Sequence, residues 1–557
     1  MITTAASTKI FKGTTVSKGI ARGPLYFKRD INQNRNFVGK GSISEEQNRY
    51  NKAVTLSQTD LNQLIARMDK THSEGREVIE AHLQLLEDPE VQDQVFGKIE
   101  NGFSSTEAYT AVVEEFRTLF SQLDDEYMKQ RVHDLDDVSK RVLFYISNPN
   151  EAYENISLSQ PSILVSDDLS PSQLLSLDKS KVLGVVLKNG STQSHTSILC
   201  RSLEIPCIVR AAIDMDAQDG NNVGFLDSIA GDLYLNPDSQ VEAKLEAKRV
   251  NYMNELKLLQ SFRNQATKTK SGRLVPLGAN ISGPQDVDSV LKNDAELVGL
   301  YRTEFLFLDR VKAPTVDEQF EVYKKVFEGL PNKRIILRTL DIGGDKVISY
   351  LNLEKEENPF LGVRGIRLCL KYKDLFKDQL RAVLRASVHA TDLGIMFPMV
   401  STIEEITESK KILDEVQKEL SLKKIPYNEK IEIGVMMEVP SLGFMLKEVA
   451  KEVSFISIGT NDLFQYSNAC DRMNADLGSI SSPNHPGFLR FLKFIIQESK
   501  TYGLHVGVCG SIAHHPQIMP FLIECGVDDL SMTAQHVLEA RKAIASIDDD
   551  QANAELS

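Results

Sequence analysis

Residues 431–440 read IEIGVMMEVP, and residues 453–460 read VSFISIGT. Each contains a short apolar run with a polar residue near its end. Continuous apolar runs of this length are typical of parallel strands buried on both faces. Similar runs occur at 274–280, 296–302, 334–341, 394–400, 504–510 and 527–532. Eight strand-helix units within residues 267–557 match the size of a closed (β/α)8 barrel, and an open doubly wound sheet is the alternative.

The chain before the barrel divides into segments of different character. Residues 31–147 have apolar residues at helical spacing and a single proline, which predicts an all-helical domain. We interpret two of its histidines, His82 and His133, as surface or interface positions. Short strand-like runs on either side predict one α/β domain, formed by 1–30 and 148–237, into which the helical domain is inserted. The charged, breaker-free segment 238–266 predicts a linking helix.

Composition excludes several classes of protein. The 557 residues carry 64 Lys and Arg against 78 Asp and Glu, a formal net charge of −14, without a basic block. This disfavours nucleic acid and anionic membranes as partners. We see no membrane span or signal-like N-terminus and expect a cytoplasmic protein. The six cysteines lack metal or disulfide spacing, which fits reduced thiols.

Polar residues at the strand ends indicate the chemistry, because the carboxyl ends of barrel strands line its mouth. Glu438 and Asp462 follow adjacent strands and could share one hard cation. With two protein ligands, the other positions suit water or substrate oxygens, as Mg²⁺ prefers. Arg302, Arg338 and Arg472 indicate an anion, because a buried guanidinium needs partners. Taken singly, each residue could equally belong to a structural ion pair or to the barrel rim.

His195 has the most distinctive setting of the ten histidines. It follows a strand and a small polar loop, and a helix is expected to begin at or just after it. Backbone N–H groups and hydroxyls at a helix N-terminus bind anions, and neutral imidazole is a competent nucleophile. The pattern predicts a histidine that can carry a phosphoryl group. The alternative is a helix-capping or packed histidine.

Motifs over nearly the whole chain share the pattern of one known family. They are SHTSILCRSLEIPCIV (194–209), GLYRTEFLFLDR (299–310), RTLDIGGDK (338–346), GVMMEVP (434–440) and SIGTNDLFQY (457–466). These motifs resemble enzyme I of the bacterial phosphotransferase system, among the phosphoenolpyruvate (PEP)-utilising enzymes. The resemblance implies a phosphohistidine α/β domain, an inserted helical domain that binds the carrier protein HPr, and a C-terminal barrel that binds PEP and forms a homodimer.

The resemblance also implies a reaction and a role for each site residue. The phosphoryl group of PEP would pass through His195 to HPr, in the first general step of sugar uptake, with release of pyruvate. Cys509, which by itself reads as a packed core cysteine, would protonate the leaving enolate. Glu438 and Asp462 would hold Mg²⁺. The residues that would bind substrate are Arg302, Arg338, Asn461, Arg472 and Arg364.

Four positions depart from the family pattern. Ser191 replaces a glycine, Gln193 a small hydroxyl residue, Arg210 a glycine, and Ser511 a glutamate. The altered loop leaves open a specialised or regulatory paralogue that acts on a different HPr-like partner. A stand-alone Mg²⁺-dependent barrel lyase is a further possibility, but it leaves the other domains unexplained. Acidic runs on the helical domain could steer a carrier with a basic face.

Overall fold

The structure is a computed structural model with two compact units, residues 1–256 and 257–557, which are described separately. It describes residues 8–28, 40–67, 73–122, 126–151, 153, 156, 158–192, 194–213, 222–308, 310, 312–344, 348, 350–351, 353–354, 356–471, 474, 477, 482 and 484–548. Within these residues, no helix is long and apolar enough to cross a membrane.

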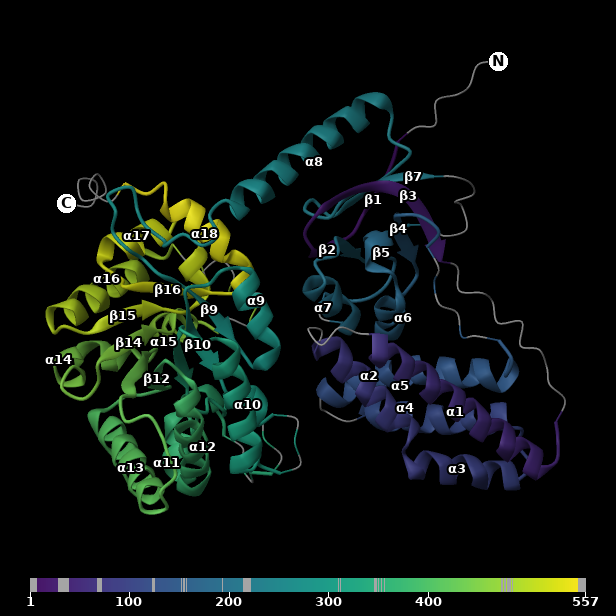
Figure 1. Cartoon of the computed structure of the whole chain (residues 1–557), viewed down its shortest axis with the longest axis horizontal. Helices are drawn as coiled ribbons and strands as arrows, with labels where there is room; N and C mark the ends of the chain where they lie inside the picture. Colours follow the sequence, from purple (N-terminus) through teal and green to yellow (C-terminus); the bar gives the residue numbers. More distant parts are fainter. Residues whose placement is uncertain are drawn as a thin grey trace. The chain divides into compact units, whose positions relative to one another are not determined.

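An eight-stranded sheet organises the N-terminal unit (Figure 1). Its strands are β1 (Lys9–Lys12), β2 (Thr14–Ser17), β3 (Ile20–Lys28), β4 (Ser162–Ser166), β5 (Val182–Leu187), β6 (Cys207–Val209), β7 (Val223–Asp227) and β8 (Asp232–Leu235). Their order across the sheet is β1-β8-β7-β3-β4-β5-β6-β2. The pairs β3-β4, β4-β5 and β5-β6 are parallel, and the remaining pairs are antiparallel. The strand-like runs found in the sequence form this sheet.

Between β3 and β4, the described residues form five helices. They are α1 (Ile43–Arg67), α2 (Ser73–Leu86), α3 (Pro89–Glu100), α4 (Ser105–Gln122) and α5 (Glu126–Ser147). Apolar residues at helical spacing, such as Val138 and Val142 on α5, are buried in one shared core. Two short helices, α6 (Pro171–Ser176) and α7 (His195–Ser202), follow β4 and β5, and α8 (Ser239–Gln260) joins the two units.

The interpretation of His82 as a surface residue is wrong. Its side chain is 1% exposed, with Nε2 3.3 Å from Asp134 Oδ1 and Nδ1 3.7 Å from Asp137 Oδ2. Two carboxylates on α5 provide polar partners for a buried imidazole, and helical spacing alone does not reveal such partners. The side chain of His133 lies outside the described residues.

The C-terminal unit is a closed barrel of eight parallel strands (Figure 1). The strands are β9 (Leu277–Ile281), β10 (Leu297–Arg302), β11 (Arg334–Arg338), β12 (Asp392–Phe397), β13 (Glu432–Met437), β14 (Phe455–Ile458), β15 (His505–Val508) and β16 (Asp529–Met532). Closure is made by β16 pairing with β9, where Ser531 lies opposite Gly278. Each predicted run supplies one strand, so the barrel prediction is confirmed and the open sheet is excluded.

Helices surround the barrel and cover its outer face. They are α9 (Val287–Lys292), α10 (Val316–Gly329), α11 (Ile366–Lys371), α12 (Lys373–Ala386), α13 (Ile403–Leu422), α14 (Leu446–Val449), α15 (Thr460–Asn468), α16 (Pro486–Thr501), α17 (Met519–Cys525) and α18 (Val537–Ile544). The large apolar core lies between these helices and the outward-facing strand residues, for example Val435 and Met437 of β13.

A second, smaller apolar cluster fills the barrel itself. Its members are Leu300, Ile336, Met396, Met436, Phe455 and Cys509. Strand side chains alternate between the two faces, so a residue two positions beyond an inward-facing residue also faces inward. Arg302, Arg338 and Glu438 each stand two positions after a member of this cluster. The alternation therefore places all three at the carboxyl end of the barrel interior.

Candidate active site

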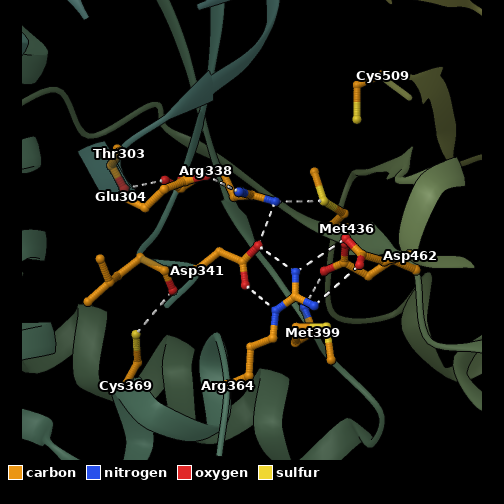
Figure 2. Close-up of polar contacts among 12 residues, drawn as sticks. Thr303, Glu304, Arg338, Asp341, Arg364, Cys369, Met399, Met436, Asp462 and Cys509 are labelled. Carbon is orange, nitrogen blue, oxygen red and sulfur yellow. Dashed lines mark hydrogen bonds and ion pairs between the residues drawn. The ribbon is translucent and has the colours of Figure 1, made fainter. Parts of the chain in front are cut away.

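Arg338 lies at the end of β11 and is buried among acidic side chains (Figure 2). Its Nη2 donates to Glu304 Oε1 at 2.8 Å, and Nη1 lies 2.9 Å from Asp341 Oδ2. Burial by itself would lower the pKa of Arg338, but the carboxylates of Asp341, Glu304 and Glu438 outweigh burial and raise it. The guanidinium is therefore held permanently charged.

Arg364 bridges two carboxylates from different parts of the barrel. Its Nε and Nη2 donate to Asp341 at 3.1 and 3.2 Å, and Nη1 and Nη2 donate to Asp462 at 3.2 Å each. The side chain is 5% exposed. Its Nη1 also donates to Tyr466 Oη at 3.2 Å, and that hydroxyl donates to the carbonyl of Phe360 at 2.6 Å. These contacts make Arg364 the link between the end of β11 and the start of α15.

The turn after Arg364 requires a glycine. Gly365 has a φ of +58°, and a Cβ at this position would lie 2.8 Å from the Cβ of Met399. An L-residue at position 365 would therefore meet both backbone strain and a steric clash. Glycine allows the backbone to turn sharply and direct the guanidinium inward.

Glu438 is the most deeply buried carboxylate of the site. Its Oε1 accepts from the Met399 N–H at 2.6 Å, whereas Oε2 is buried and has no hydrogen-bond partner among the described residues. Burial raises the pKa of Glu438 to about 8; Asp341 and Asp462 add to the rise, and the two buried arginines oppose it. An orphaned, buried carboxylate oxygen beside Asp462 is the feature expected of a cation ligand.

The other residues predicted at the barrel mouth differ in their hydrogen-bond partners. Arg302, at the end of β10, makes no hydrogen bond or ion pair with any described residue. The side-chain oxygen of Asn461 accepts from the N–H and hydroxyl of Ser511 at 3.2 and 2.7 Å. Arg302 is thus open to a ligand, and Ser511 fixes the orientation of the Asn461 amide. Arg472 lies outside the described residues.

Cys509 immediately follows β15, and its side chain belongs to the apolar cluster inside the barrel. Burial raises the pKa of the Cys509 thiol to about 11, with smaller opposing effects from Ser457 and Arg338. The sulfur therefore remains a protonated thiol at neutral pH. Such a group can donate a proton, and it is a poor nucleophile.

The His195 loop belongs to the N-terminal unit. Helix α7 begins at His195, and its N-cap is Ser194, whose hydroxyl oxygen accepts from the Ser197 N–H at 3.3 Å. The capping role considered for His195 is thus filled by the residue before it. The hydroxyls of Ser197 and Thr196 donate to backbone carbonyls of Ser191 and Leu169, both at 2.6 Å. The His195 side chain and all of Gln193 lie outside what is described.

Four of the predicted barrel residues lie in one cluster: Arg338, Arg364, Glu438 and Asp462. Asp341 pairs with both Arg338 and Arg364, and Arg364 pairs with Asp462. Glu438 interacts electrostatically with these four residues. Nowhere in the described part of the chain do three or more His, Cys, Asp or Glu side chains form a possible metal site.

Family models match the chain on both sides of α8. The model described as PEP-utilising enzyme, N-terminal matches residues 12–131, and the mobile-domain model matches residues 158–231. The model described as PEP-utilising enzyme, PEP-binding domain matches residues 257–549, which is more than half of the chain. This chain belongs to the PEP-utilising enzymes.

Relatives of this PEP-utilising enzyme align over almost its full length. The phosphoenolpyruvate-protein phosphotransferase of Staphylococcus carnosus is 38% identical over 550 residues, which cover 98% of this chain and 95% of the relative. The protein of that name from Staphylococcus aureus strain MRSA252 is 40% identical over 546 residues, covering 96% and 94%. An NMR structure of Enzyme I (nEIt) is 28% identical and covers 44% of this chain and 99% of its own, with a TM-score of 0.38.

In this PEP-utilising enzyme, sequence analysis missed the residues that hold the arginines in place. Asp341 pairs with both buried guanidinium groups. Gln379 of α12 donates to Thr303 Oγ1 at 2.9 Å and accepts from the Leu340 N–H at 2.9 Å. Asp341 lies inside a quoted strand-end motif and could have been found there. Gln379 comes from a helix, and no local signal identifies it.

The backbone conformation at position 210 explains why the family pattern has a glycine where this chain has Arg210. Arg210 has a φ of +55°, which a glycine adopts without strain. Its Nε donates to the Gly190 carbonyl at 3.3 Å, at the base of the His195 loop. This PEP-utilising enzyme therefore has a left-handed backbone at position 210 despite the side chain.

Proposed function

We propose that this chain is a phosphoenolpyruvate-protein phosphotransferase. It takes the phosphoryl group of PEP onto His195, passes it to a carrier protein and releases pyruvate. The observation that carries the proposal is the buried cluster at the barrel mouth, where Arg338 and Arg364 are fixed beside Glu438 and Asp462. The names and full-length alignment of the staphylococcal relatives support the same activity.

The arginines bind and orient the substrate. Arg302 has no hydrogen-bond or ion-pair partner among the described residues and is available to the phosphate or carboxylate of PEP. Arg338 and Arg364 are already positioned by carboxylates, so no reorganisation is needed when the substrate arrives. Asn461, held by Ser511, presents its amide N–H₂ group, and the family resemblance adds Arg472.

The carboxylates fit a divalent cation. Glu438 contributes a buried oxygen without a hydrogen-bond partner in the described structure, and Asp462 is the second acidic ligand. Mg²⁺ suits two carboxylates combined with water and substrate oxygens. When bound, it would supply positive charge to phosphate and enolate oxygens.

The phosphoryl step needs positioning and charge neutralisation rather than covalent help from the barrel. The P–O bond of PEP breaks, a P–N bond to the imidazole of His195 forms, and the electron pair remains on the enolate oxygen. The Cys509 thiol then donates its proton to the enolate carbon, which yields pyruvate. Solvent returns a proton to the thiolate. The raised pKa of Cys509 ensures that the proton is present when it is needed.

The acceptor in this proposal is HPr, bound by the helices α1–α5, in the sugar phosphotransferase system of the cytoplasm. The barrel would form the homodimer. The acidic surface that could attract HPr is smaller than the sequence indicates, because Asp134 and Asp137 are buried against His82. Exposed acidic groups near the start of α3 include Glu87 and Glu90.

Labelling tests the proposal. The full chain with ³²P-labelled PEP and Mg²⁺ should give an acid-labile, base-stable phosphoprotein and an equivalent amount of pyruvate. His195→Ala should abolish the label, whereas His389→Ala, which removes a partly buried histidine paired with Glu328, should not. Equal labelling of the His195→Ala protein would refute the assignment. Addition of HPr should then remove the label, and HPr binding without transfer would instead support a regulatory paralogue.

A further inference from the structure

Two hydrogen bonds cross the barrel interior and end on the backbone of Cys509. The hydroxyl of Ser531, on β16, donates to Asn280 Oδ1 at 2.6 Å. The Nδ2 of Asn280, on β9, donates to the Cys509 carbonyl at 2.9 Å. Asn280 thus reaches past β16 to the end of β15, since the three strands are neighbours in the order β15-β16-β9.

Ser531 fits only because two neighbouring residues lack side chains. A Cβ on Gly278 would lie 2.9 Å from Ser531 Oγ, and a Cβ on Gly299 would lie 2.4 Å from Ser531 Cβ. An alanine at 531 would fill most of this space, but Asn280 Oδ1 would lose its hydrogen-bond donor. The hydroxyl therefore has a specific effect, which is to fix which end of the Asn280 amide faces Cys509.

The other hydrogen bonds of Cys509 with described residues go to β14. Its N–H donates to the Ile458 carbonyl at 3.2 Å, and its sulfur lies 3.7 Å from the same oxygen. A Cβ on the next residue, Gly510, would lie 1.8 Å from Thr460 Oγ1. The Cys509 peptide is thus held from two sides of the barrel, by β14 and by Asn280.

We infer that Asn280 and Ser531 are positioning residues for Cys509, and that they aim its thiol at the carbon that is protonated. The inference rests on the proposed function, in which the S–H bond breaks and a C–H bond forms at C3 of the enolate. The enolate oxygen becomes the carbonyl of pyruvate in the same step. Proton transfer depends steeply on the distance and direction of the donor, so a small rotation of the Cys509 peptide reduces its rate.

The experiment measures proton transfer separately from phosphoryl transfer. Pyruvate, Mg²⁺ and the full-length protein are incubated in D₂O, and deuterium incorporation at C3 is followed by NMR. Ser531→Ala and Asn280→Asp should each slow the exchange at least tenfold, with Cys509→Ala as the reference for full loss. Calorimetric affinities for Mg²⁺ and pyruvate should stay within about twofold of the unmodified protein.

The matched control is Ser387→Ala. Ser387 is also buried; its hydroxyl donates to the Leu384 carbonyl and accepts from the Asn428 N–H, before the start of β12. The Ser387→Ala protein should exchange deuterium at the normal rate, with a loss of thermal stability similar to that of the Ser531→Ala protein. Unchanged exchange in the Ser531 and Asn280 variants would overturn the inference, as would an equal loss in the control. Failure of the unmodified protein to exchange pyruvate would also overturn the inference, whereas failure to label His195 would instead refute the proposed function.

Discussion

Arg364→Met should destabilise the barrel by about 3 kcal/mol in the absence of divalent cations. Arg364 is 5% exposed, and its guanidinium makes four hydrogen bonds to the carboxylates of Asp341 and Asp462. Removing one partner of a buried ion pair costs about 3–5 kcal/mol, because the other charge remains buried. Asp341 retains Arg338 at 2.9 Å, so the loss falls mainly on Asp462 and the lower end of the range applies.

Urea unfolding of the full chain, with the barrel transition followed in EDTA and in saturating Mg²⁺, measures this loss. Mg²⁺ should recover part of the lost stability, because a cation on Asp462 replaces the missing charge. Phosphoryl transfer should fall even when Mg²⁺ restores stability, because the guanidinium also orients substrate. A loss below about 1 kcal/mol, the same with and without Mg²⁺, would refute the reasoning.

Arg381→Met is the matched control for this experiment. Arg381, on α12, donates to Glu419 of α13 at 2.8 Å on the outer surface of the barrel. Exposed ion pairs of this kind contribute about 0–1 kcal/mol. The control should therefore show a small loss of stability that does not depend on Mg²⁺.

Three further predictions concern other positions. Gly510→Ala should cost about 1–3 kcal/mol and reduce pyruvate formation, measured by thermal unfolding and a coupled assay, because its Cβ would overlap Thr460 Oγ1. Arg210→Gly should be about 1 kcal/mol more stable than Arg210→Ala in urea unfolding, since both lose the guanidinium and only glycine relieves the left-handed φ; equal stabilities would contradict this. The hydrogen bond to Asp529 raises the pKa of His505. The stabilisation that protonated His505 gives to the folded state is therefore complete below about pH 6.5, and it is lost as pH rises through the higher folded-state pKa. His505→Gln should therefore flatten the decline of Tm above about pH 6.5, and an unchanged profile would contradict the assignment.

The barrel could be predicted from sequence because two local signals mark each strand. An apolar run marks its length, and an abrupt change to polar residues marks its carboxyl end, as in the run that ends at Glu438. The alternation of side chains also links Ile336 to Arg338 and Met436 to Glu438. These are local regularities of a buried parallel strand, and they need no knowledge of the tertiary structure.

Long-range pairing could not be predicted in the same way. Arg364 was assigned only by resemblance, and nothing near it in sequence indicates that it joins Asp341 to Asp462. His82 was placed on the surface because helical spacing does not show that two carboxylates on another helix surround it. Asn280 and Ser531 were visible as polar residues in the first and last predicted strands. Their significance depends on barrel closure, which brings those strands together.

The space around Ser531 has a consequence for how the barrel sequence can vary among relatives. Residues 278, 299 and 531 share one volume, in which a serine side chain takes the room that two glycines leave empty. A larger residue at position 278 or 299 requires a smaller one at 531, and that change removes the hydroxyl that holds Asn280. The three positions should therefore co-vary as a unit, and single substitutions at any of them should be rare in sequences that keep the cysteine.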